Sequence, residues 1–260
     1  MGDPRTYQPA DACSPSVVIG PTARVSTDVR FGRWVIVESG VTIEPGAVIG
    51  NHVTIHEGAH IGHDCVIADF AVVGKRPALA PGSTAAAGDL PGIVLGDGCK
   101  VGSHTVLMAG STFGDGCVMG DNAGVRERCT LGERVVVGRS VTVENDTQIG
   151  SRTRIQSGAY VTAYVTIEED VFIAPMVVTT NDNFMGRTER RFELMRGCTI
   201  RRGARVGGGV HILPGIEIGA DAFIATGAVV TRDVPPRMVM MGVPAKPVRE
   251  VAEDELLENQ

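Results

Sequence analysis

The sequence predicts an all-β fold, a parallel β-helix built from six-residue repeats. Three observations predict it: an apolar side chain recurs every six residues, a small or β-branched residue follows four positions after each of these, and the 260 residues include 34 glycines. A six-residue period does not produce one apolar stripe on an α-helix, and so many glycines would destabilise helices. Repeats of this length are typical of a solenoid in which three hexads close one triangular coil.

The recurring apolar positions fall into three blocks, and none of them is polar. They are Ile19, Val25, Phe31, Val37, Ile43, Ile49, Ile55, Ile61, Ile67 and Val73 in the first block, Leu95, Val101, Leu107, Phe113, Met119, Val125, Leu131, Val137, Val143, Ile149, Ile155, Val161, Ile167 and Ile173 in the second, and Ile200, Val206, Ile212, Ile218, Ile224 and Val230 in the third. The second inward position, for example Ala23, Val29 and Val35, suits the inside of a narrow column. An aromatic content of only 4% agrees with a core too thin for large rings.

The two breaks between the blocks predict two segments that leave the column, at 75–93 and 179–199. Long loops on a regular scaffold are usually functional. We expect their roots to lie roughly 22–25 Å apart along the axis, at one strand spacing per coil. The chain then divides into an N-terminal cap at 1–16, a β-helix of about ten coils at 17–235, and a C-terminal segment at 236–260 that ends in a short helix from Glu250 to Glu258.

Charge and cysteine usage narrow the functional classes. The formal net charge is −6 and no basic run occurs, which argues against a nucleic-acid partner. No apolar stretch is long enough to span a membrane, and no signal-peptide pattern precedes the repeats, so we expect a cytoplasmic protein without a membrane partner. Four cysteines occupy small inward positions, where free buried thiols are expected: Cys65, Cys99, Cys117 and Cys129. Cys13 and Cys198 lie off the repeat, and their state stays open.

Three stretches carry a resemblance to a known family. They are IEEDVFIAP followed by TTND, the segment IRRGARVGGGVHILPG, and the closing DVPPRMVMMGVPAKPVR. They resemble the hexapeptide-repeat N-acyltransferases that act on nucleotide-linked amino sugars. The N-terminal half is matched by its period alone. The resemblance implies a left-handed β-helix, a homotrimer with ligands between neighbouring columns, and transfer of an acetyl or short acyl group from CoA to the amine of a nucleotide-linked deoxyamino sugar.

The same resemblance implies a CoA site at the C-terminal coils. Small residues would let the backbone approach the pantetheine, and basic residues would meet the phosphates through charge-assisted hydrogen bonds. The candidates are Gly207, Gly208, Ala225 and Thr226 for the first role, and Arg201, Arg202, Lys246 and Arg249 for the second. The alternative for the basic residues is a solvated surface charge, and the two arginines of the re-entry segment have the further alternative of pairing with nearby glutamates.

The second predicted loop carries the candidates for acceptor binding. Asn181, Asp182 and Asn183 would bind the sugar and its amine, against the alternative that they only form a turn. Related sequences often carry a carboxylate at the position where this chain has Ala163, so an acid role is missing there. Tyr160 and Tyr164 would shape the pocket instead.

A general base is not required, because a neutral sugar amine is already nucleophilic, but histidine is favoured if one exists. The string AHIGHDC resembles the catalytic region of the UDP-N-acetylglucosamine O-acyltransferase of lipid A synthesis, which implies His63 as base with Asp64 beside it. His104 follows the first loop and is a second candidate; His211 is a weaker one. That resemblance gives the alternative function, acylation of a UDP-sugar from an acyl carrier protein; a non-catalytic scaffold is the third. No two histidines are five residues apart, the spacing known from hexapeptide carbonic anhydrases, so no metal is predicted.

Overall fold

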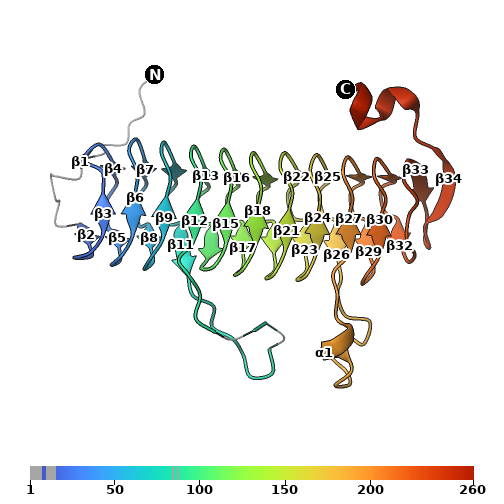
Figure 1. Ribbon diagram of the computed structural model, residues 1–260, viewed down its shortest axis with the longest axis horizontal. Helices are drawn as coiled ribbons and strands as arrows, with labels where there is room; N and C mark the ends of the chain where they lie inside the picture. The colour runs from blue at the N-terminus through green and yellow to red at the C-terminus, as the bar shows by residue number, and fades with distance from the viewer. Residues whose placement is uncertain (1–7, 10–15, 84, 87) are drawn as a thin grey trace.

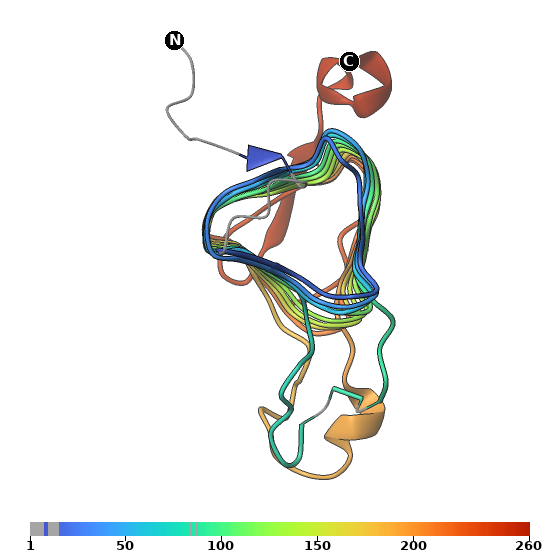
Figure 2. The same ribbon diagram turned by 90° about the vertical axis from the view of Figure 1, so that its left-hand side faces the viewer.

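The computed structural model describes residues 8–9, 16–83, 85–86 and 88–260, and it forms a three-sided column of short strands (Figure 1). Viewed along the axis, successive coils superpose on one triangle (Figure 2). From β5 (Val35–Val37) to β32 (Val229–Val230), each strand pairs in parallel with the strand three elements earlier, so every side of the triangle is one sheet. The prediction of an all-β parallel β-helix with hexapeptide repeats is confirmed, and the architecture is consistent with left-handed winding.

The three sheets are here called face A, face B and face C. Face A has 13 strands: β1 (Gln8–Pro9), β4 (Arg30–Phe31), β7 (Val48–Ile49), β10 (Val66–Ile67), β13 (Lys100–Val101), β16 (Val118–Met119), β19 (Val136–Val137), β22 (Arg154–Ile155), β25 (Phe172–Ile173), β28 (Arg205–Val206), β31 (Phe223–Ile224), β33 (Met238–Met241) and β34 (Lys246–Glu250). Face B has 11: β2 (Val17–Ile19), β5 (Val35–Val37), β8 (Thr54–Ile55), β11 (Val72–Lys75), β14 (Val106–Met108), β17 (Gly124–Val125), β20 (Thr142–Val143), β23 (Tyr160–Val161), β26 (Val178–Thr179), β29 (His211–Ile212) and β32 (Val229–Val230). Face C has 10: β3 (Arg24–Val25), β6 (Thr42–Ile43), β9 (His60–Ile61), β12 (Val94–Leu95), β15 (Thr112–Phe113), β18 (Thr130–Leu131), β21 (Gln148–Ile149), β24 (Thr166–Ile167), β27 (Thr199–Ile200) and β30 (Glu217–Ile218).

The core consists of the apolar side chains that point into the column from its three faces and corners. In the two-residue strands from β3 to β32 the second side chain points inward, so Ile43, Ile49 and Ile55 are fully buried. The cysteines follow the same rule. The four predicted buried thiols are confirmed, Cys198 is buried as well, and Cys13 lies outside the described residues. Burial raises the pKa of the Cys198 thiol to about 12, so it stays protonated and packs as a small apolar side chain.

The three edges of the column differ in what they carry. We call the turns that follow face-B strands the loop corner (108–111, 126–129, 144–147 and 162–165 among them), those that follow face-C strands the tail corner (132–135, 150–153, 168–171 and 201–204 among them), and those that follow face-A strands the ring corner (32–34, 50–52, 68–70 and 102–104 among them). A residue on one coil lies beside the residue eighteen positions later, as in the pair Val66 and Val48. Counting in eighteens therefore identifies lateral neighbours.

Both projecting segments leave the column at the loop corner. The first follows β11 and the second follows β26, and each returns to the next strand of face C. Figures 1 and 2 show them hanging from the same edge, separated along the axis. The second contains α1 (Arg191–Leu194), the one α-helix of the described residues, which is too short to cross a membrane. The two predicted loops are thus confirmed, and they share one corner.

The C-terminal end closes the column differently from the prediction. Parallel stacking continues to β33, whose Met240 lies beside Ile224 after a coil of only sixteen residues. β34 then folds back antiparallel on β33. Two 3₁₀ turns, Glu253–Glu255 and Leu257–Asn259, replace the expected short helix. Most of the predicted N-terminal cap lies outside the described residues; its strand β1 pairs antiparallel with β4.

Candidate active site

Buried polar side chains concentrate at the loop corner. Eight polar or charged side chains are buried among the described residues. Six of them lie at this corner or on the face-B strand that enters it: Ser111, Glu127, Asn145, Thr147, Thr162 and Thr179. Burying polar groups is unfavourable unless they are paired, and the other two corners each bury only one among the described residues, Thr105 at the ring corner and Thr153 at the tail corner. The segment of the loop corner between the two loops is therefore the first candidate for a functional site.

Glu127 is the centre of this segment. Its carboxylate is 0% exposed and accepts hydrogen bonds from Arg126 Nε at 3.1 Å and Arg126 Nη2 at 2.8 Å. Arg126 Nη1 donates to Glu144 on the next coil at 2.9 Å. A fully buried carboxylate is tolerated only when a cation and hydrogen bonds satisfy it. Glu127 therefore fixes the Arg126 guanidinium, which in turn presents Glu144 toward the outer surface of the corner.

A second ion pair connects this corner to the first loop. Arg128 donates to both carboxylate oxygens of Asp146, at 2.7 and 2.8 Å, and its Nη1 donates to the carbonyl oxygen of Ala86 at 3.3 Å. Burial alone would raise the pKa of Asp146, but the bonds from Arg128 and Asn145 outweigh it and hold that pKa below its usual value. Asp146 is accordingly a carboxylate at neutral pH, and its partner holds the first loop against the coils.

Tyr160 lies beside Glu144 on the outer side of face B. Burial, followed by the charge of Glu144 and a hydrogen bond to it, raises the pKa of the Tyr160 phenol. The phenol therefore remains protonated at neutral pH and is a hydrogen-bond donor. Tyr164 lies one coil beyond Asp146 on the same corner. Both tyrosines that the sequence singled out are thus brought next to carboxylates of the preceding coil.

The second loop holds the three predicted acceptor-binding residues, and each has a different environment. Asn181 Nδ2 donates to the carbonyl oxygen of Ala163 at 3.5 Å. The two oxygens of Asp182 accept the backbone N–H groups of Phe184 at 2.7 Å and Gly186 at 2.8 Å. These bonds lower the pKa of Asp182, so its carboxylate shapes the loop. Asn183 is exposed.

Sequence reasoning missed the charged residues of the loop corner. The resemblance places an acid at the position of Ala163, and the hexad that contains Ala163 has none. In the structure, Glu144 and Asp146 on the preceding coil lie beside Thr162 and Tyr164. The signal was available in the spacing, because these pairs are eighteen residues apart. Two carboxylates therefore lie on the coil that precedes Ala163, on either side of Asn145, which is in register with it.

The three residues predicted as catalytic do not meet the loop corner within one chain. His63 and Asp64 are at the tail corner, where the His63 backbone N–H donates to Asp97 Oδ1 at 2.7 Å. His104 is at the ring corner. His211 is on face B, with its Nδ1 3.2 Å from the carbonyl oxygen of Gly209. These side chains reach the inter-loop segment only if it faces another copy of the chain.

His104 belongs instead to a stack of four rings at the ring corner. Trp34, His52, Phe70 and His104 occupy the same corner position in four successive coils, and all have positive φ, from 54° to 62°. Adjacent ring centroids lie 4.9, 4.8 and 4.8 Å apart, with interplanar angles of 16°, 3° and 1°. The ring spacing equals the spacing of parallel strands, so the column itself sets the stacking distance. We call this set the ring stack.

The eight residues predicted to bind CoA are divided between two corners and the terminal strand. Gly207, Gly208, Ala225 and Thr226 lie on adjacent coils of the ring corner, and Lys246 begins β34 beside them. A Cβ on Gly207 would lie 2.6 Å from the backbone nitrogen of Thr226, so coil packing alone requires this glycine. No ion-pair partner of Lys246 occurs within the described part of the chain.

The basic residues at the tail corner are engaged with acids. Arg201 pairs with Glu168 at 2.8 Å and with Glu217 at 2.7 Å. Arg202 lies 3.4 Å from Glu169. Arg249, on β34, donates to the carbonyl oxygen of Glu250 at 2.8 Å and lies 3.9 Å from Glu255. Of the four predicted phosphate contacts, Lys246 has the least compensated charge.

Comparisons with known proteins agree with the repeat. Residues 40–75 and 197–232 match the family model described as the bacterial transferase hexapeptide (six repeats). A serine acetyltransferase of Buchnera aphidicola is 38% identical over 96 residues, which are 37% of this chain and 33% of that protein. The galactoside O-acetyltransferase of Escherichia coli is 37% identical over 90 residues, 34% of this chain and 44% of that protein. The matched part thus spans less than half the length of these relatives.

Solved structures extend the likeness along the column. The UDP-N-acetylglucosamine acyltransferase of Francisella novicida covers 91% of this chain and 70% of its own, with a TM-score of 0.52 and 19% identity. At this identity the likeness establishes the fold alone. Fold and repeats together define a hexapeptide-repeat β-helix protein. These relatives are acetyltransferases by name, and the part of this chain that matches them is its hexapeptide repeat.

Proposed function

We propose that this protein is an N-acyltransferase that moves an acetyl or short acyl group from CoA to the amine of a nucleotide-linked deoxyamino sugar. The observation that carries the proposal is the buried charge network around Glu127 between the two loops, in a chain whose named relatives are acetyltransferases. Amine acylation, rather than hydroxyl acylation, is supported by the resemblance of the segments IEEDVFIAP and TTND to sugar N-acyltransferases.

The reaction joins the amine nitrogen to the thioester carbon and breaks the carbon–sulfur bond. CoA leaves as the thiolate, and the nitrogen loses one proton, so the products are an amide and the free thiol. The site must hold the amine near the thioester and stabilise the oxyanion that forms on its carbonyl oxygen. A strong base is unnecessary, since a neutral amine attacks a thioester directly.

The loop corner contains groups suited to these tasks. Glu144, fixed by Arg126, accepts a hydrogen bond from the amine and orients its lone pair. Tyr160, kept protonated by its raised pKa, donates a hydrogen bond. Asn181 and Asn183, at the start of the second loop, bind sugar hydroxyls. The pantetheine of CoA lies along Ala225 and Thr226, and Lys246 contacts a phosphate.

These two sets lie at different corners of one column, so the proposal includes an oligomer. In a homotrimer, the loop corner of one chain faces the ring or tail corner of its neighbour. His104 of the ring corner, or His63 with Asp64 of the tail corner, then reaches the acceptor from the adjacent chain. Light scattering of the purified protein tests this point, with a trimer mass expected.

The function is tested by thiol release. The protein is mixed with acetyl-CoA and a thiol reagent, and a panel of dTDP- and UDP-linked amino sugars is added. Thiol release with one amino sugar, and not with its hydroxyl analogue, is the expected result. Arg126→Gln should reduce kcat/KM at least tenfold, while Arg24→Gln, which changes an exposed arginine on the first strand of face C, should not change it.

Two other results would contradict the proposal, and each would favour a different function. Transfer from an acyl carrier protein but not from CoA, abolished by His63→Ala, would favour the UDP-sugar acyltransferase that the string AHIGHDC resembles. No stabilisation by CoA in a thermal-shift measurement, with no transfer from either donor, would make the chain a scaffold.

A further inference from the structure

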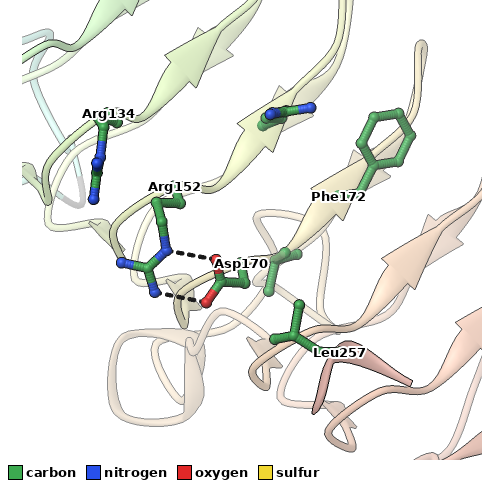
Figure 3. Close-up of a pocket in the computed structure, with 7 residues that line it drawn as sticks. Arg134, Arg152, Asp170, Phe172 and Leu257 are labelled. Atoms are coloured by element: carbon green, nitrogen blue, oxygen red, sulfur yellow. Dashed lines mark hydrogen bonds and ion pairs between the residues drawn. The ribbon is translucent and has the colours of Figure 1, made fainter. Parts of the chain in front are cut away.

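A second charged region lies where face A meets the tail corner. It is a cavity of about 400 Å³, and its lining includes Arg134, Arg152, Arg154, Asp170, Phe172 and Leu257. Figure 3 shows Arg152 facing Asp170 at the centre of this opening, with Arg134 and Phe172 on opposite sides of that pair and Leu257 close to Asp170. None of these residues belongs to the loop-corner network. We call this cavity the arginine pocket.

The arginine pocket has uncompensated positive charge. Arg152 donates to both oxygens of Asp170 at 2.6 Å, and this pairing lowers the pKa of Asp170, so the pair is neutral overall. Arg134 and Arg154 have no ion pair or side-chain hydrogen bond within the described residues. Two free guanidinium groups therefore share one cavity, in a chain whose net charge is −6.

The coil register sets the positions of these charges. Arg134, Arg152 and Asp170 are spaced by eighteen residues, so they stand in one row along the tail corner, each with φ between 55° and 63°. Arg154 lies directly beside Phe172 on face A, because β22 and β25 pair in that register. The pocket thus has Arg134 and the Arg152–Asp170 pair along one edge, and the Phe172 ring next to the second free guanidinium, that of Arg154.

The C-terminal tail forms an apolar wall of the pocket. Leu257 lines it, and the Leu257 backbone N–H donates to Asp221 Oδ1 at 3.1 Å. Arg205 pairs with Glu255 at 2.8 Å, and Arg237 pairs with Glu258 at 2.9 Å. These bonds hold the tail against the column. The cavity therefore combines two free cations with the side chains of Phe172 and Leu257, a composition suited to a ligand that is both anionic and aromatic.

We propose that the arginine pocket binds the nucleoside diphosphate end of a substrate. Phosphate oxygens accept charge-assisted hydrogen bonds from Arg134 and Arg154, and the base packs on the exposed part of the Phe172 ring. This inference rests on the proposed function in one respect, because it requires a substrate that carries a nucleoside diphosphate. Two substrates do: the nucleotide sugar and CoA, whose nucleotide is an adenosine bisphosphate.

Direct binding tests the pocket without any acyl transfer. Isothermal titration is carried out with UDP, dTDP, adenosine 3′,5′-bisphosphate and pyrophosphate, on the unaltered protein and on three variants. These are the double variant Arg134→Gln/Arg154→Gln, Phe172→Ala, and the control Arg139→Gln. Unchanged melting temperatures and oligomer mass establish that the variants fold and assemble.

The double variant should weaken binding of the occupant about a hundredfold, from roughly tenfold for each charge-assisted contact. Phe172→Ala should weaken nucleotides at least threefold and leave pyrophosphate unchanged, because pyrophosphate has no base to stack. Arginine dependence for UDP or dTDP assigns the pocket to the nucleotide sugar, and dependence for the adenosine bisphosphate alone assigns it to CoA.

Three results would overturn the inference. They are no measurable binding of any nucleotide, equal affinity in the double variant and the control, or a change in oligomer mass in the double variant with nucleotide affinity retained, which would make the arginines contacts between copies. Failure of the thiol-release assay while arginine-dependent binding persists would sink the proposed reaction and leave the pocket. Transfer that is insensitive to both arginines would sink the pocket alone.

Discussion

The loop corner and the ring corner share the stacking of successive coils but carry different side chains, ion pairs at the first and stacked rings at the second. At both, side chains eighteen residues apart contact each other because successive coils are one strand spacing apart. The loop corner buries Glu127 and connects it through Arg126 to Glu144. The ring corner instead exposes much of its stack, with Trp34 57% and Phe70 46% accessible. Since stacked rings satisfy the same register, the fold does not require buried charges at a corner, and this makes the loop-corner network the candidate for function.

Removal of the Glu127 carboxylate is the test of this comparison with the largest expected effect. Glu127→Gln leaves the Arg126 guanidinium without its buried partner, so we expect a loss of about 3 kcal/mol in the free energy of unfolding. Displacement of Arg126 and Glu144 should lower kcat/KM about a hundredfold. Urea denaturation and the thiol-release assay measure the two effects. Glu133→Gln, an exposed carboxylate at the tail corner, is the matched control and should change stability by less than about 0.5 kcal/mol.

The ring stack should respond additively, ring by ring. Phe70 contacts two rings, His52 and His104, whereas Trp34 contacts one. Each stacked pair contributes about 0.5–1.5 kcal/mol beyond buried area, so Phe70→Leu should destabilise the protein by roughly twice as much as Trp34→Leu. Chemical denaturation of both variants checks the ratio. Equal losses would mean that the rings act independently and that the stacking geometry contributes nothing.

The C-terminal end of the ring corner offers a smaller effect, on the donor alone. Lys246 lies after the last parallel strand and has no salt bridge in the described structure, so Lys246→Ala should weaken CoA binding about tenfold without changing the melting temperature. Lys100→Ala, which removes an exposed lysine from face A, is the control. A CoA affinity that is the same in both variants would remove Lys246 from the donor site.

The smallest expected effect is on the pH dependence of the unfolding free energy, which tests the contribution of the Arg128–Asp146 ion pair. The folded-state pKa of Asp146 is lowered from 3.8, so its pair with Arg128 contributes stability above that pH, and the contribution is lost as the pH falls through the lowered value. The difference in unfolding free energy between the unaltered protein and Asp146→Asn should be constant at neutral pH and shrink below 3.8. A difference that grows toward low pH would show that the sign is wrong.

The sequence was sufficient for the column and insufficient for the grouping of its side chains. The six-residue period predicted the core, the parallel sheets and both loop positions, because an inward side chain is identified from its position within its own hexad. It did not reveal Arg126, Glu127 and Glu144, since a hexad read alone does not indicate which residue lies beside it on the next coil. The sequence left two roles open for Arg201 and Arg202, a contact with phosphate and pairing with nearby glutamates. The structure shows the pairs with the glutamates that the register places beside them, and the contact with phosphate stays a prediction. The repeat pattern also does not predict which side chains would meet in the proposed homotrimer.

The constant repeat makes the column a molecular ruler. The two loops are anchored five coils apart on one edge. Duplicating or deleting one eighteen-residue coil between them would change their separation by one strand spacing, and every remaining side chain would stay on the same face of the column. Relatives that differ by a multiple of eighteen residues in this interval should therefore select acceptors of different length without altering any contact residue.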